Sequence, residues 1–147
     1  MAEKPLWKCP ECGRTFANRN QTHTCAPLGP LDPMFNGSDP LVRDTFDRIL
    51  SVVSECGPVT ILPEKTRIAL HVRMSFAAFT PRQHWLTGHL ILAREAAHPC
   101  IQRVEHYSPR NILHALRLRT PADVDSGLSA LLREAYAVGC QHHLRAP

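Results

Sequence analysis

Four residues near the start of the chain have the types and spacing of a zinc-binding set. Cys9 and Cys12 stand in a Cys-Pro-Glu-Cys-Gly stretch, and a His-Thr-Cys stretch further on supplies His23 and Cys25. Three thiolates and one imidazole are typical of a closed, tetrahedral structural zinc site. A segment this short buries no core of its own, so metal binding would supply on the order of 10 kcal/mol of its folding free energy. We therefore predict that these residues hold one Zn²⁺ ion.

Two other interpretations of these cysteines stay open. The last two predicted ligands, His23 and Cys25, are closer together than is usual, so the pattern can also be two unrelated thiols beside a chance His-x-Cys. Cys9 and Cys12 also have redox-motif spacing, but such a motif needs a thioredoxin-like βαβ context, which the flanking sequence does not supply. The other three cysteines stand alone. Isolated cysteines favour a reducing, cytoplasmic compartment over a disulfide framework.

Positive charge is concentrated in the middle of the chain. The formal net charge is +4, and residues 61–119 carry nine Lys or Arg against three acids. The same stretch holds six of the nine histidines. Concentrated positive charge attracts anions at long range. A solvated sheet surface can have the same composition, so charge by itself does not decide between the two interpretations.

Strand alternation would gather much of this charge on one sheet face. Alternation along residues 66–74 places Arg67, His71 and Arg73 on one side at steps of roughly 7 Å. Guanidinium groups bind phosphate oxygens in pairs, so we expect this face to bind nucleic acid or another polyanion. The alternative is an ordinary soluble sheet surface. The predicted anion-binding residues are Lys65, Arg67, His71, Arg73, His89, Arg103, Arg117 and Arg119.

Signals for catalysis are few. Residues 61–119 hold too few acids for a magnesium nuclease centre, and no nucleophile elbow, phosphate loop or metalloprotease motif is present. A metal-independent ribonuclease would need His71 and His89 as its acid and base. Trp85 and Tyr107 are in phase with polar positions and are candidates for base stacking, although two rings are a weak signal. We expect a binding protein rather than an enzyme, with a protein–protein adaptor as the alternative.

Two helices are predicted at the ends of the main domain. The first should begin at Pro40, after Asp39 as its cap, and end before Gly57. The second should open at Pro121 with Thr120 as its cap and end at Gly139, and a break near Gly127 is compatible with the sequence.

Between these helices the apolar period changes from that of a helix to two, which is typical of strands. The expected strands are residues 59–62, 66–74, 84–92, 101–107 and 112–119, with a hairpin or short strand around Phe76 and Phe79. The fold class is therefore α+β, an antiparallel five- or six-stranded sheet with both helices packed on one face.

The chain divides by composition into four parts. We expect a zinc-knuckle module at 1–27, a linker at 28–39, an α+β sandwich at 40–140 and a flexible tail at 141–147. No stretch is apolar enough to predict a membrane span, so we expect no membrane partner. The first residues lack the apolar run of a secretory signal.

Several stretches resemble a family of uncharacterised bacterial proteins with a domain of unknown function. The first two are the Cys-Pro-x-Cys-Gly-Arg-x-Phe stretch at 9–16 and the Asn-Gln-x-His-x-Cys stretch at 20–25. Further matching stretches are 57–60, 65–69, 72–73, 76–77 and 134–136. The resemblance covers roughly residues 7–140. It implies the same zinc ligands and a knuckle followed by an α+β domain, and it implies no activity.

Overall fold

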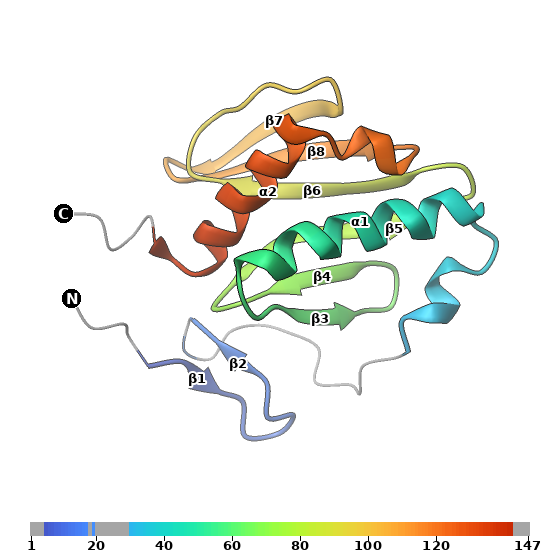
Figure 1. Ribbon diagram of the computed structural model, residues 1–147. Coiled ribbons are helices and arrows are strands. Elements are labelled where there is room, and N and C mark those ends of the chain that lie inside the picture. Colours follow the sequence, from blue (N-terminus) through green and yellow to red (C-terminus); the bar gives the residue numbers. More distant parts are fainter. Residues whose placement is uncertain (1–4, 18, 20–29, 143–147) are drawn as a thin grey trace.

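The computed structural model describes residues 5–17, 19 and 30–142 (Figure 1). Its elements, in chain order, are β1 (Trp7–Lys8), β2 (Thr15–Phe16), the 3-10 helix η1 (Asp32–Phe35), α1 (Pro40–Cys56), β3 (Thr60–Pro63), β4 (Ile68–His71), β5 (Ser75–Pro81), β6 (Leu86–Leu92), β7 (Ile101–Ser108), β8 (Asn111–Leu118), the 3-10 helix η2 (Pro121–Asp123) and α2 (Ser126–Gly139). In the described residues, β1 and β2 pair with each other, and the other strands form a six-stranded antiparallel sheet ordered β3-β4-β5-β6-β8-β7. The α+β class is confirmed.

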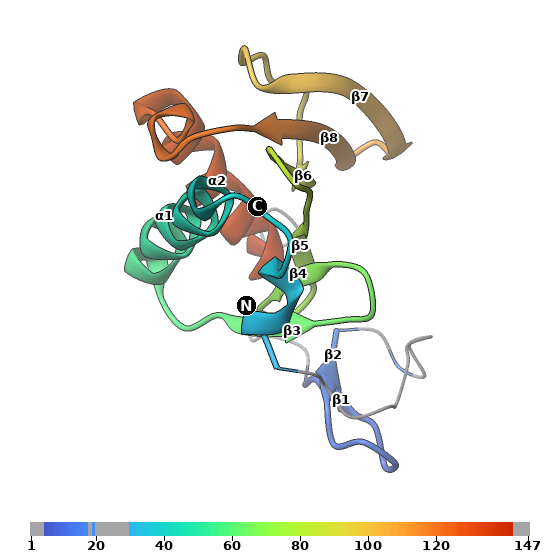
Figure 2. The same ribbon diagram turned by 90° about the vertical axis from the view of Figure 1, so that its right-hand side faces the viewer.

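Both helices cover one face of the six-stranded sheet, and neither covers the opposite face (Figures 1 and 2). The apolar stripe of α1 packs on the sheet through contacts such as the edge-to-face pair of Phe46 and Phe79, whose ring centroids are 6.2 Å apart. Leu86, Leu90 and Leu92 of β6 are buried in the same core. The predicted packing of the two helices on one sheet face is therefore confirmed.

The first helix has the predicted bounds, Pro40–Cys56, but its predicted cap works differently. Asp39 occupies the N-cap position without a side-chain capping bond. Its carboxylate instead lies 2.7 Å from Nδ1 of His84. At the other end, Gly57 has φ +146°, and a Cβ there would lie 2.6 Å from Oη of Tyr136. Glycine is required at this position both by its backbone conformation and by its neighbour.

The strand predicted at 66–74 is shorter than the alternation suggested. The register shifts between Leu70 and His71, and β4 ends at His71. Arg73 therefore lies in the turn after β4, where its backbone N–H donates to the carbonyl of Gly139 at 2.9 Å. The prediction that Arg73 continues the same strand face as Arg67 and His71 is wrong, because the irregular backbone ends the alternation.

Of the two alternatives predicted around Phe76 and Phe79, the strand is confirmed and the hairpin is not. The region is the seven-residue strand β5, which lies between β4 and β6. The predicted start of the second helix at Pro121 is wrong. The capping signals at 120–123 belong to η2, whose capping box is formed by Thr120 and Asp123. The helix α2 starts separately at Ser126, because the backbone of Val124 leaves the helical region with φ −85° and ψ 68°.

The segment before α1 is attached to the core. Phe35 of η1 is buried, and its ring centroid is 5.4 Å from that of Phe46. In the part of the chain that the structure describes, no helix combines the length and the apolar character needed to cross a membrane.

Candidate functional site

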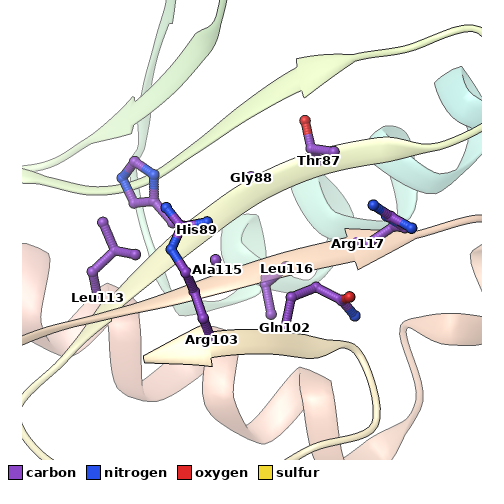
Figure 3. A pocket seen from close by; sticks show the side chains of 9 residues that line it. All are labelled: Thr87, Gly88, His89, Gln102, Arg103, Leu113, Ala115, Leu116 and Arg117. Atoms are coloured by element: carbon purple, nitrogen blue, oxygen red, sulfur yellow. The ribbon is translucent and has the colours of Figure 1, made fainter. Parts of the chain in front are cut away.

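The open face of the sheet contains a hollow of about 300 Å³ over β6, β8 and β7 (Figure 3). Its lining residues are Thr87, Gly88, His89, Gln102, Arg103, Leu113, Ala115, Leu116 and Arg117. The helices lie behind the sheet in this view, so the hollow is on the face that they do not cover.

Strand register explains both the shape and the chemistry of the hollow. Ala115 of β8 pairs with His89 of β6 on one side and with Arg103 of β7 on the other. One step along the same face, Thr87 pairs with Arg117. The side chain of Ala115 is much shorter than those of His89 and Arg103 on either side of it, so the middle of this row is recessed. The hollow is therefore formed by side chains that strand pairing brings together, and no loop is needed to form it.

His89 is half-buried and acts as a neutral group near pH 7. Burial lowers the pKa of His89 from 6.5 to about 4, and the positive charges of Arg67 and Arg103 lower it as well. A neutral imidazole has one nitrogen that donates and one that accepts a hydrogen bond. His89 was predicted as an anion-binding residue, and its environment makes it a hydrogen-bonding group in the hollow rather than a source of charge.

The positive charge of the site comes from arginines. The guanidinium of Arg117 lies 4.8 Å from the ring centroid of Trp85, and that of Arg119 lies 5.8 Å from it. Both distances are those of cation–π contacts. Arg117 forms no ion pair with any residue that the structure describes. The ring therefore holds Arg117 in place without neutralising it.

Two other arginines of the face already pair with carboxylates. Nε of Arg103 donates to Oε1 of Glu105 at 2.9 Å, and this contact lowers the pKa of the Glu105 carboxyl. Nε of Arg67 donates to Glu64 at 2.8 Å. These pairs are exposed and worth little in stability. Because Nε makes the contact in each case, the terminal nitrogens of both guanidinium groups are not engaged by these bonds.

The remaining predicted residues lie away from the hollow. His71 is 5% exposed, so the expectation that it faces solvent is wrong. Its Nε2 lies 3.1 Å from the carbonyl oxygen of Thr15, and its ring packs edge-to-face on Phe16 with centroids 5.7 Å apart. Arg73 donates from Nε to the side-chain oxygen of Gln141 at 3.1 Å. Lys65 is exposed in the turn between β3 and β4.

This arrangement does not bring together the pair of histidines that a ribonuclease would need. His71 lies on β4 and His89 on β6, with β5 between them. The strand spacing and the offset in register put their Cα atoms roughly 12 Å apart. The placement gives no support to His71 and His89 acting as acid and base on one phosphate.

The N-terminal hairpin presents the first two predicted zinc ligands at its turn. Cys9 N–H donates to the carbonyl of Arg14 and Gly13 N–H donates to the carbonyl of Cys9, each at 2.9 Å. Gly13 has φ +77°, a conformation that favours glycine. This tight turn sets Cys9 and Cys12 at the end of the hairpin, with Cys9 buried.

The other two predicted ligands, His23 and Cys25, lie outside the described residues. Within 5–17, 19 and 30–142, no group of three or more His, Cys, Asp or Glu residues is placed to hold a metal ion. The zinc site therefore stays a prediction. The structure does place the hairpin against the sheet, through the contacts of Thr15 and Phe16 with His71 (Figure 2).

Sequence reasoning missed Gln102 as a lining residue. Regular alternation would set it opposite to its neighbour Arg103, but the register of β7 shifts between Ile101 and Arg103, which puts Gln102 in an irregular position. Both residues then line the hollow. No local pattern in the sequence signals this irregularity.

The fold and the site define an α+β domain with a basic, hollowed sheet face. A family model described as "Domain of unknown function (DUF5655)" matches residues 31–139. The chain belongs to this family, and the match spans both helices and the whole six-stranded sheet but not the β1–β2 hairpin. Comparison with curated proteins and with solved structures gave no match. The resemblance to an uncharacterised family is confirmed for this domain.

Proposed function

We propose that this protein binds single-stranded nucleic acid on the open face of its sheet. The observation that carries the proposal is the placement of Arg117, which lines the hollow, rests on Trp85 and has no carboxylate partner in the described part of the chain. Arg119 shares the same ring, and Arg103 stands across the hollow. Guanidinium groups bind phosphate oxygens, and an open sheet face with a concave centre suits unpaired bases.

We also propose that residues 1–27 bind one structural Zn²⁺ through Cys9, Cys12, His23 and Cys25. Support comes from the soft thiolate donors and from the tight Cys9–Gly13 turn. Thiolate ligands must stay reduced, so we place the protein in the cytoplasm. The zinc would fix the hairpin that rests on His71, and its contribution would be structural rather than catalytic.

Salt dependence of binding tests the proposed nucleic-acid interface. The probe is a short, labelled, mixed-sequence single-stranded oligonucleotide, titrated by fluorescence anisotropy at several salt concentrations. Each phosphate contact should contribute about −0.7 to the slope of log affinity against log salt. Replacing both Arg117 and Arg119 with Gln should weaken binding and reduce the steepness of the slope by about 1.4.

The control is Arg48→Gln, which removes one positive charge where the test variant removes two. Arg48 is exposed on α1, in the layer that covers the other sheet face. Affinity and slope should stay as in the unmodified protein. Absence of oligonucleotide binding at low salt would overturn the proposal and would favour the protein–protein adaptor.

A further inference from the structure

We infer that β7 binds a second copy of this chain, with the two β7 strands antiparallel about a two-fold axis at Val104, so that both sheets join into one. The strand is the last of its sheet, and among the residues that the structure describes no further strand lies beside its outer edge (Figure 2). It is eight residues long, and none of them is buried. An exposed edge of this kind is a template for another strand. The inference goes beyond the proposed function and does not rest on it.

The opposite edge of the sheet is poorly suited to such pairing. Its strand, β3, has four residues and ends at Pro63, which has no N–H to donate to a ladder. Pairing β7 of one copy with β3 of another would also build an open-ended chain of molecules, whereas pairing β7 with β7 closes a dimer. The second copy therefore contributes the same strand.

Backbone groups of β7 alternate between the ladder with β8 and the outer edge. The N–H of Arg117 donates to the carbonyl of Cys100 at 3.1 Å, so Arg117 turns its backbone toward β7. Ala115 lies two residues earlier on β8, turns the same way and is paired with Arg103. The next residue of β7, Val104, therefore turns its N–H and carbonyl to the outer edge. Two Val104 residues that face each other across the axis can exchange both backbone hydrogen bonds.

The charges of β7 select this register. Arg103 and Glu105 stand one residue before and one residue after Val104, so the two-fold axis sets Arg103 opposite Glu105 of the second copy, and the reverse. These positions form pairs without backbone bonds, in which opposing side chains come closest. Moving the axis by one residue would set Arg103 opposite Arg103 or Glu105 opposite Glu105. The strand is thus complementary to itself in one register.

The contact between Arg103 and Glu105 within the chain leaves room for this second pairing. Nε of Arg103 makes the bond, so its terminal nitrogens can bind another carboxylate. The Arg103 side chain is 64% exposed and can turn from the hollow toward the second copy without losing packing. The register shifts of β7 lie on either side of residues 103–106 and limit regular pairing to its middle. We therefore expect a weak dimer, with a dissociation constant on the order of 100 µM.

The first test uses the unmodified full-length chain. Sedimentation equilibrium should show dimers as the protein concentration rises. Over the same range, hydrogen exchange followed by NMR should slow at the amides of Val104 and His106, which turn to the outer edge. The amides of Arg103 and Glu105, which turn toward β8, are the control within the same strand and should keep their exchange rates.

The second test reverses one charge at a time. Glu105→Arg and Arg103→Glu each give both positions the same charge, so each variant by itself should dimerise at least about tenfold more weakly. An equimolar mixture of the two variants sets opposite charges against each other in both pairs and should restore association. Arg48→Glu reverses an exposed charge on α1 and should change nothing.

A chain that is still monomeric at about 1 mM, roughly ten times the expected dissociation constant, would overturn the inference. So would undiminished dimerisation of Glu105→Arg, or an exchange rate at Val104 that does not change with concentration. Neither test contains nucleic acid, so these results leave the proposed function as it stands. The exchange measurement needs no substitution and does not depend on how the variants fold.

Discussion

Acidification should destabilise the fold through His89. The pKa of this imidazole falls from 6.5 to about 4 in the folded protein, mainly because it is buried and also because Arg67 and Arg103 are near. Between these two values the unfolded chain binds a proton that the folded chain does not, so stability falls as the pH falls through this window. At about 1.4 kcal/mol per pH unit, the loss from pH 7 to pH 4 is at most about 3 kcal/mol.

Two measurements check this value. The ring protons of His89, followed by NMR, should titrate well below pH 6. Urea denaturation should show that His89→Gln loses less stability than the unmodified protein between pH 7 and pH 4.5, because glutamine does not titrate. Burial also lowers the pKa of His71, so the difference between the two proteins, rather than the total pH dependence, isolates His89.

His106→Gln is the control, since His106 is exposed on β7 at 2.6 Å from Glu95 and lies outside the hollow. It should not reduce the loss of stability on acidification as His89→Gln does. A midpoint for His89 at or above pH 6.5 would refute the argument, because it would mean that solvent or a carboxylate reaches the ring.

Three further substitutions test the rest of the structure. Cys12→Ser should lower the zinc content of the purified protein from one ion per chain, measured by elemental analysis, and an unchanged content would exclude Cys12 as a ligand. Gly88→Ala should destabilise the fold by more than about 3 kcal/mol in urea, since its Cβ would lie 2.3 Å from the carbonyl oxygen of Ala78. Gly37→Ala is the comparison, because it has open space and a positive φ and should cost only about 1 kcal/mol. His71→Ala should speed hydrogen exchange in the β1–β2 hairpin while the sheet core keeps its protection; equal protection would mean that the hairpin is held by other contacts.

Local signals in the sequence were sufficient for the elements that depend on local chemistry. The helix from Pro40 to Cys56 follows from its apolar stripe and from the glycine after it, and the alternation of β6 places Thr87 and His89 on the open face as predicted. The hollow was partly predictable for the same reason, since Arg103 and Arg117 also follow from alternation.

The features that were mispredicted depend on contacts between distant segments. His71 is buried because a hairpin more than fifty residues earlier rests on it, with Thr15 as its hydrogen-bond partner. The early end of β4 comes from a register shift that no residue type in the sequence predicts. The same holds for Gln102, which enters the hollow through an irregularity in β7. Alternation is a reliable guide only while the ladder stays regular.

The order of the last three strands would make the proposed nucleic-acid binding dependent on complete folding. Because β8 lies between β6 and β7 in the sheet, the hollow depends on the pairing of β6 with β8, two strands that are separated along the chain by β7. A chain that has made β6 and β7 but not β8 lacks Ala115 and Arg117, and its other arginines have no common surface. A growing polypeptide on the ribosome therefore lacks the proposed site until β8 is released and paired, so under this proposal an unfinished copy would not compete with mature ones for nucleic acid.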